Sequence, residues 1–193
     1  DTLDPGNGHQ CVRFSAIASA GVTVSKSSLV HNDLSLEEGQ RIYFSAWYRV
    51  DAAGTLDNLF LVDIEENIGI GSGPGLRLAL KDEAGYVWVE RGKMLEDDFL
   101  QPEDNRTAFP RNQWVHLEME MLLSQTRTGE VKVWQDGTQL FDLKDLRTMP
   151  VDKSTIIQGT TGIYRSLEVG LTANSTGRDL PLWMDDVRLE LRD

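Results

Sequence analysis

The sequence predicts an all-β fold in which two antiparallel sheets pack into a sandwich. Two observations carry this prediction. Hydrophobic and polar residues alternate over most of the 193 residues, and Gly, Asp, Asn and Pro recur between the alternating segments. A helical repeat is almost absent. We expect one domain over residues 1–193, and because there is only one cysteine, Cys11, its core forms without an intrachain disulfide.

About ten short strands account for the alternation. In Ile42–Val50 and Trp114–Leu122 every second residue is hydrophobic, which gives each segment a core-facing side. The dipeptide Asp136-Gly137 is a strong hairpin signal. Helix is limited to a turn at Ser35–Gln40 or Leu143–Arg147. The other expected strands are Cys11–Ala16, Leu59–Ile64, Leu76–Leu80, Tyr86–Val89, Glu130–Trp134, Leu140–Leu143, Ile163–Leu171 and Leu182–Leu191.

The charge balance excludes several classes of partner. The chain has 19 Lys and Arg against 31 Asp and Glu, a net charge of −12. Nucleic acids and anionic membranes attract basic surfaces, so neither is expected as a partner. No apolar run approaches the roughly 20 residues that span a bilayer. Acidic residues are dense in Leu95–Asp104, which we expect to be a solvated loop.

The amino-terminal residues DTLDPGNGHQ lack both the basic start and the apolar core of a signal peptide. The acidic composition, however, is typical of extracellular domains. On that ground we expect a secreted, periplasmic or cell-surface protein, of which this chain is a module.

The strand faces opposite the core are rich in aromatic and hydrogen-bonding side chains. A face that is merely solvated would favour Lys, Glu, Thr and Ser. Aromatic rings offer flat apolar surfaces, and charged side chains bind hydroxyl groups. We expect these residues to share one hollow face, although single tryptophans also fill the ends of sandwiches. The residues are Trp47, Arg77, Trp88, His116, Glu118, Glu120 and Trp134.

Three segments resemble the concanavalin A-like lectin and glucanase jelly rolls. They are Leu36–Val50, Asn112–Phe141 and Trp183–Leu191. With Gly162-Ile-Tyr-Arg165 near the end, the sequence is most similar to the heparin-lyase and glucuronan-lyase group of that superfamily, which also includes laminin-G-like modules. The resemblance implies a two-sheet antiparallel jelly roll with a concave face that receives a polysaccharide or oligosaccharide.

The resemblance also implies a lyase site. Lyases of this group use a Tyr, a His and a Lys or Gln; Tyr164 matches the tyrosine, and His116 is the candidate histidine. Arg77 or Arg165 would neutralise a uronate carboxylate. The basic residue expected two positions before Gly162 is replaced by Thr160. The opposite interpretation is a structural tyrosine and a histidine packed beside Trp114.

Two further kinds of catalytic site have less support. Asp63-Ile64-Glu65-Glu66 resembles half of the catalytic strand of jelly-roll glucanases, but Leu61 stands where the nucleophile should be. Glu118 and Glu120 lie two apart on one strand face, as paired glycosidase carboxyls require, but such acids are commonly plain surface. No serine-nucleophile motif is present.

A calcium ion is the one cofactor that the resemblance suggests. It would lie on the convex side and be held by Asp185 and Asp186, since carboxylates are preferred calcium ligands. In a strictly alternating strand one of these acids would point into the core. Arg188 or Arg192 could pair with it instead.

Three functions remain open. The leading hypothesis is carbohydrate binding without catalysis by the concave face, through Trp47, Arg77, Trp88, His116, Glu118, Trp134, Tyr164 and Arg165. The alternative is a polysaccharide lyase that acts on a uronic-acid-containing glycan with His116 and Tyr164 as catalytic groups. The third is an adhesin or protein-interaction module. The negative charge favours a neutral glycan over an anionic one.

Overall fold

A computed structural model describes residues 10–19, 24–51, 53–66, 73–151, 155 and 159–192. The described part contains eleven strands and no helix. The strands are β1 (Val12–Ala16), β2 (Ser25–His31), β3 (Arg41–Val50), β4 (Leu59–Glu65), β5 (Gly75–Lys81), β6 (Tyr86–Gly92), β7 (Val115–Leu122), β8 (Gly129–Gln135), β9 (Thr138–Leu146), β10 (Ser166–Asn174) and β11 (Leu180–Arg192).

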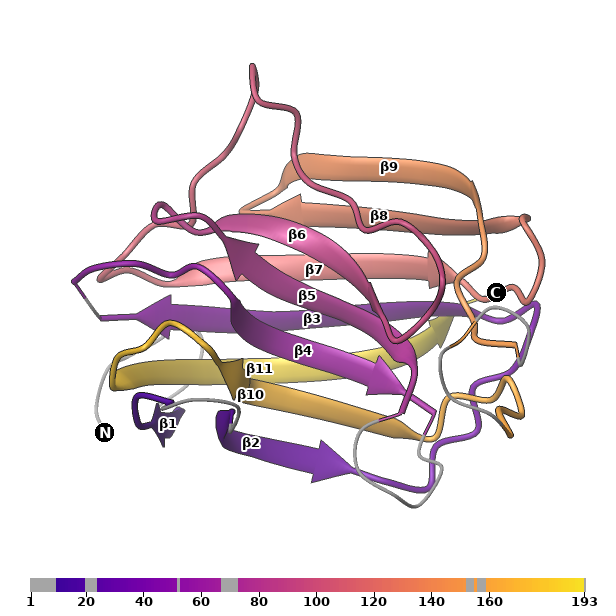
Figure 1. The fold of residues 1–193 in the computed structure, drawn as a ribbon, viewed down its shortest axis with the longest axis horizontal. Helices are drawn as coiled ribbons and strands as arrows, with labels where there is room; N and C mark the ends of the chain where they lie inside the picture. The colour runs from indigo at the N-terminus through magenta and orange to yellow at the C-terminus, as the bar shows by residue number, and fades with distance from the viewer. Residues whose placement is uncertain are drawn as a thin grey trace.

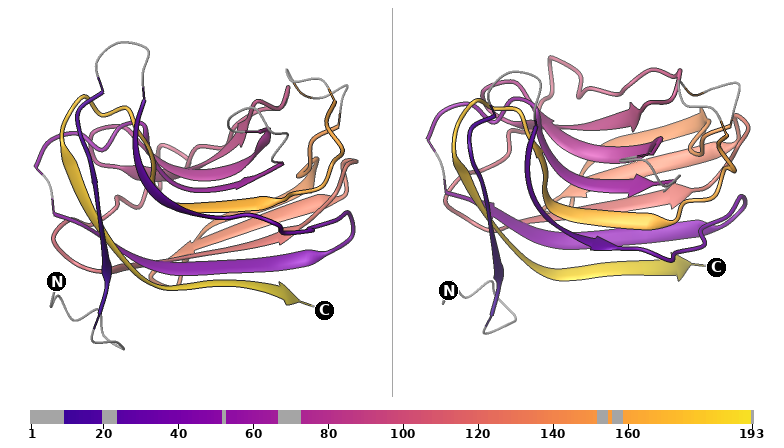
Figure 2. Two further views of the ribbon diagram at one scale, coloured as in Figure 1. Left: turned by 90° about the horizontal axis from the view of Figure 1, so that it is seen from below. Right: turned by 60° about the horizontal axis from the view of Figure 1, so that its bottom comes forward.

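The strands form two antiparallel sheets packed face to face (Figure 1). One sheet has six strands in the order β1-β11-β3-β7-β8-β9, and the other has five in the order β2-β10-β4-β5-β6. Both sheets bend in the same direction (Figure 2), so the outer face of the five-stranded sheet is concave and that of the six-stranded sheet is convex. The predicted two-sheet jelly-roll sandwich is confirmed.

The core lies between the sheets and is built by the predicted alternation. In β3 the inward residues Phe44, Ala46 and Tyr48 are fully buried, and in β7 Leu117 and Met119 are buried opposite them. Complete burial of side chains of this size stabilises the fold by about 1.5–3 kcal/mol each. The Tyr48 hydroxyl donates to the Leu61 carbonyl at 3.4 Å across the core. One connected core therefore joins both sheets.

Three local details differ from the sequence prediction. β2 was not expected, because Ser25–His31 is a polar edge strand that is largely exposed and lacks a hydrophobic face. Neither predicted helical turn forms. Ser35–Gln40 is a bridge and turn in which the Gln40 side chain accepts from the Glu37 amide. Leu143–Leu146 continues β9 and pairs with β8 across a register shift. The Asp136-Gly137 hairpin between β8 and β9 is confirmed, with both residues at positive φ.

A β-bulge interrupts β11 at its middle. Asp185 pairs with Trp47 of β3, whereas the next paired residue, Arg188, stands opposite Ser45. Two residues, Asp186 and Val187, therefore face one residue of β3, and Asp186 has a φ of 48°. The bulge breaks the alternation, so neither aspartate points into the core: Asp185 is half-buried and Asp186 is exposed.

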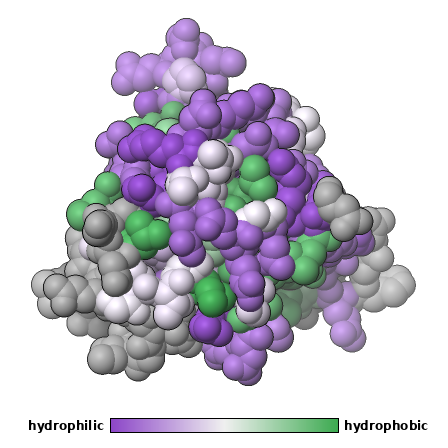
Figure 3. All heavy atoms as spheres, turned by 90° about the vertical axis from the view of Figure 1, so that its right-hand side faces the viewer, coloured by the Kyte–Doolittle hydropathy of each residue, from purple (hydrophilic) through white to green (hydrophobic). Residues whose placement is uncertain are grey.

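The end of the sandwich seen in Figure 3 is mostly hydrophilic. Hydrophobic residues on this face are scattered between polar ones rather than gathered into one patch. Among the described residues there is also no helix that is long and apolar enough to cross a membrane.

Candidate functional site

The surface residues singled out from the sequence lie on two opposite faces. Arg77 of β5 and Trp88 of β6 are on the concave sheet. Trp47, His116 and the other predicted residues of β3, β7 and β8 are on the convex sheet. The expectation of one shared face is wrong, because alternation shows which residues avoid the core but not which sheet their strand joins.

A row of charged side chains crosses the concave face. Glu168 of β10, Asp63 of β4, Arg77 of β5 and Glu90 of β6 stand opposite one another in consecutive strand pairs. In an antiparallel sheet, residues in such a row point to the same side. The next row along β4 adds Glu65. Four acids and one arginine are therefore held together by the sheet register.

Arg77 holds this row together. Its Nη1 donates to Glu90 Oε2 at 3.0 Å, its Nη2 donates to Glu65 Oε1 at 3.1 Å, and its Nε lies 3.4 Å from Asp63 Oδ2. The neighbouring Gly92 gives the guanidinium room, because a Cβ there would lie 2.5 Å from the guanidinium carbon. The side chain of Arg77 is only 12% exposed, so its position is fixed by these contacts.

Glu168 completes the row with partners from the edge strand. Its carboxylate accepts from the Ser28 hydroxyl at 2.6 Å and pairs with the Lys26 ammonium at 3.2 Å. The unpredicted strand β2 thus supplies a second cation to the concave face.

Asp63 is the most deeply buried carboxyl of the row. Its Oδ1 accepts from the Thr172 hydroxyl at 3.0 Å. Burial raises the pKa of Asp63 to about 8; Arg77 opposes the rise, and Glu65 adds to it. Asp63 is therefore mostly protonated at neutral pH and acts there as an uncharged acid.

Lys93 follows β6 directly and faces the same cluster. Burial lowers its pKa, and the neighbouring Arg77 cation lowers it further, while Glu65 and Asp63 oppose the change. Its carbonyl accepts from the Thr155 hydroxyl at 2.8 Å, which anchors the backbone at this position. With Asp63 protonated, the cluster has three carboxylates (Glu65, Glu90 and Glu168) and three cations (Lys26, Arg77 and Lys93).

An aromatic patch lies beside the charged row. Phe60 of β4 and Trp88 of β6 meet edge to face, with ring centroids 6.1 Å apart, and both flank Ala79 of β5. Lys81 lies 5.7 Å above the Trp88 ring. The indole N–H of Trp88 is buried and has no partner among the described residues. Trp88 is only 8% exposed, so these rings pack beside the charged row and offer little open surface to a ligand.

Tyr164 is not available to a ligand. It is completely buried, and its hydroxyl donates to the Thr148 carbonyl. Burial raises the pKa of Tyr164 above the usual value, so the phenolate that could accept a proton is disfavoured. The GIYR segment is held in place by Glu66, which accepts from the Thr161 hydroxyl at 2.6 Å and the Gly162 amide at 3.1 Å. The prediction that Tyr164 contacts a ligand is wrong for this reason, whereas the adjacent Arg165 is exposed.

His116 lies on the convex face, far from the charged row in the fold. Its ring stacks on Trp47, with centroids 4.7 Å apart, and its Nδ1 lies 3.6 Å from Glu118 Oε2. The six-stranded sheet lies between His116 and the core in which Tyr164 is buried, so the predicted His–Tyr pair is not brought together. Glu120 is paired with Arg41 and Arg192 at 3.1 and 3.2 Å. That carboxylate is thus engaged in ion pairs.

Calcium at Asp185 and Asp186 stays a prediction. Asp185 Oδ1 accepts from the Asp186 amide at 2.8 Å, and Asp185 Oδ2 is buried without a partner in the described part of the chain. These are two carboxylates, whereas calcium takes six to eight oxygen ligands. Within the described ranges, the one group of three acids close enough to share an ion is Asp63, Glu65 and Glu168, where Arg77 and Lys26 already supply positive charge.

The comparisons with known proteins agree with this architecture. A family model described as polysaccharide lyase matches residues 6–188. The chain belongs to this polysaccharide lyase family. No curated protein sequence matches it.

Solved structures, two of them lyases, share the fold at low sequence identity. An endo-β-1,4-glucuronan lyase from the fungus Trichoderma reesei is 15% identical, with a TM-score of 0.71 over 97% of this chain and 84% of that one. The cellulose-induced protein Cip1 is also 15% identical, with a TM-score of 0.66 over 98% and 83%. The family 7 alginate lyase A1-II′ is 11% identical, with a TM-score of 0.62 over 94% and 79%. Family membership and these neighbours support a function on polysaccharides.

Sequence reasoning missed most of the concave cluster. Asp63 and Glu65 were considered only as glucanase residues, and Glu90, Lys93 and Glu168 were not considered. The available signal was the occurrence of charged residues inside otherwise apolar strands such as LFLVDIE, where a solvated acid is not expected.

Proposed function

We propose that this protein is a polysaccharide lyase that cleaves a uronic-acid-containing glycan on the concave face of the five-stranded sheet. The observation that carries the proposal is the buried row around Arg77, in a chain of a polysaccharide lyase family. It places an uncharged acid, Asp63, and a lysine with a lowered pKa, Lys93, on one face. Titratable groups with shifted pKa values mark functional sites.

The reaction would be a β-elimination. A base removes the proton at C5 of the uronate, the C4–O4 bond breaks, a C4–C5 double bond forms, and O4 takes up a proton. We assign the base to Lys93, since its lowered pKa increases the fraction of neutral amine. The ammonium that results can return the proton to O4, so no oxidant or cofactor is consumed.

The local charge is compatible with an anionic substrate although the whole chain is acidic. With Asp63 protonated, three carboxylates face Lys26, Arg77 and Lys93. The cluster is neutral while Lys93 is an ammonium and has one excess negative charge when Lys93 is the neutral base, which is far from the −12 of the whole chain. Loss of the Asp63 proton adds a negative charge to this site. We therefore expect KM for the polymer to rise above about pH 8.

The experiment is a lyase assay with glucuronan and alginate, followed through the ultraviolet absorbance of the unsaturated product. We expect product with at least one of these polymers and a loss of kcat of about 100-fold or more in Lys93→Met. Lys144→Met, at an exposed lysine of β9 in the six-stranded sheet, serves as the matched control. Normal kcat in a folded Lys93→Met protein would remove Lys93 from the mechanism.

Binding without cleavage is the second candidate function. One observation favours it: the described concave face contains neither a histidine nor an accessible tyrosine at the charged row. In that case the same polymers would retard the protein in affinity electrophoresis and yield no unsaturated product. Either activity on a polymer too large to enter a cell supports the proposal that the protein is secreted or lies at the cell surface.

A further inference from the structure

We infer a second saccharide site on the convex sheet, which binds a neutral glycan chain without cleaving it. The site is a groove across β11, β3, β7 and β8, on the face of the sandwich opposite the charged row. We call it the convex groove. It goes beyond the proposed lyase activity, because a neutral sugar has no carboxylate to make the C5 proton acidic.

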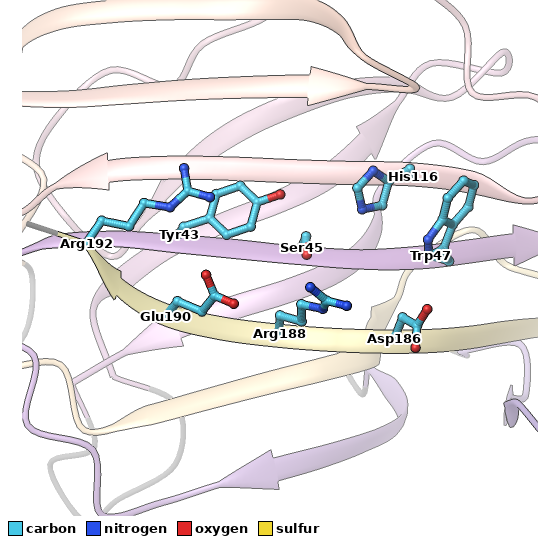
Figure 4. A pocket seen from close by; sticks show the side chains of 8 residues that line it. All are labelled: Tyr43, Ser45, Trp47, His116, Asp186, Arg188, Glu190 and Arg192. Carbon is cyan, nitrogen blue, oxygen red and sulfur yellow. The ribbon is translucent and has the colours of Figure 1, made fainter. Parts of the chain in front are cut away.

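Two adjoining pockets form the convex groove. The first has a volume of about 330 Å³ and is the one drawn in Figure 4; the second has a volume of about 460 Å³. They share Tyr43 and Arg192, so they run into each other along the sheet. The first is also lined by Ser45, Trp47, His116, Asp186, Arg188 and Glu190, and the second by Glu118, Glu120, Lys132, Trp134 and Gly137.

Aromatic rings are spaced along the groove. Trp47 and His116 stack against each other at its first end, with an interplanar angle of 23°. Tyr43 lies at the centre, under the Arg192 guanidinium at 3.6 Å from the ring centroid. Trp134 lines the second pocket, opposite Glu118 in the strand register. Flat rings at intervals suit the C–H faces of successive sugars in a chain.

Polar groups in the first pocket are available for a ligand. Arg188 and Glu190 line it from β11, and their side chains form no hydrogen bond or ion pair within the described part of the chain. In the described part of the chain, the hydrogen bond of Asp186 is made by its backbone amide, which donates to the Asp185 carboxylate, and not by its side chain. These groups can bind hydroxyls without first breaking an internal contact, unlike Arg77 on the concave face.

The charge of the groove points to a neutral occupant. In the first pocket Asp186 and Glu190 balance Arg188 and Arg192. In the second, Glu118 and Glu120 face Lys132 and the shared Arg192, so the whole groove has four acids and three bases. A polyanion would meet more repulsive than attractive charges, whereas hydroxyl groups can donate to the acids and accept from the bases.

The test measures binding rather than cleavage. Isothermal titration with soluble β-1,4-linked oligosaccharides of glucose, xylose and mannose is compared with titration with a uronate oligosaccharide of the same length. We expect binding of at least one neutral oligosaccharide. Trp47→Ala and Arg188→Ala should each weaken it by about tenfold. Because neutral sugars cannot undergo the elimination, this result is independent of whether the protein is a lyase.

Controls separate lost binding from lost structure. Arg13→Ala removes an arginine from β1 of the same sheet, outside the groove, and should leave the affinity unchanged. Arg188 is exposed, so its variant is expected to fold even if Trp47→Ala does not, and thermal unfolding checks both. Absence of any neutral binding, unchanged affinity in both variants, or equal displacement by the uronate oligosaccharide would each overturn the inference.

Discussion

The concave and convex faces hold their charged side chains in opposite ways. On the concave face Arg77 is 12% exposed and contacts three carboxyl groups. On the convex face Arg192 is 42% exposed and pairs with Glu120 alone. Burial with interlocking contacts fixes geometry and shifts pKa values, as at Asp63, whereas exposure leaves groups free to meet a ligand. The first arrangement suits proton transfer, and the second suits recognition.

The largest expected effect comes from removing the cation that joins the concave row. Arg77→Met leaves Asp63, Glu65 and Glu90 without their shared partner in a mostly buried site. We expect the free energy of unfolding to fall by about 3–5 kcal/mol, measured by urea denaturation. Arg192→Met, the matched change on the convex face, should cost less than about 1 kcal/mol. Similar losses in both variants would show that the two faces do not differ as described.

The next effect is a dependence of stability on pH that comes from Asp63. Its pKa is raised by burial, so the folded state binds the proton more tightly than the unfolded state. The contribution of Asp63 to stability is therefore greatest at low pH and is lost as the pH rises through about 8. From pH 6 to pH 8 this one group should account for a loss of about 2 kcal/mol.

The Asp63→Asn variant isolates that contribution. The amide stays uncharged and can still accept from Thr172. We expect its unfolding free energy, measured by denaturation at pH 6, 7 and 8, to lack the loss that the wild type shows. Parallel curves for the two proteins would mean that Asp63 is ionised throughout this range.

The smallest expected effect concerns Tyr164, which belongs to neither face. Tyr164→Phe removes the hydroxyl that donates to Thr148 and should cost about 1–2 kcal/mol of stability. We expect kcat to be unchanged, because the tyrosine is buried and engaged. A loss of lyase activity in a stably folded variant would instead restore Tyr164 to the catalytic role that its motif suggests.

The fold could be predicted largely from local pattern. Alternation located β3 and β7, and Asp136-Gly137 located the β8–β9 hairpin, because both signals are contained in adjacent residues. β2 gave no such signal: an edge strand exposed on both faces has no need for a hydrophobic side.

The site could not be assembled in the same way. Trp88 and Trp134 both face away from the core, but the first belongs to the concave sheet and the second to the convex sheet. That assignment depends on which strands pair, which is long-range information. The row from Glu168 to Glu90 likewise joins residues 78 positions apart through the pairing of β10, β4, β5 and β6.

The bulge in β11 reverses which residues of the strand face inward and which face outward. Before it Met184 faces the core, and after it Arg188, Glu190 and Arg192 face outward while Leu189 packs against the core. Loss of a single residue between Asp185 and Arg188 would exchange these roles and drive three charged side chains toward the interior. We accordingly expect homologous sequences to tolerate substitutions along this strand but not the deletion of a residue at the bulge.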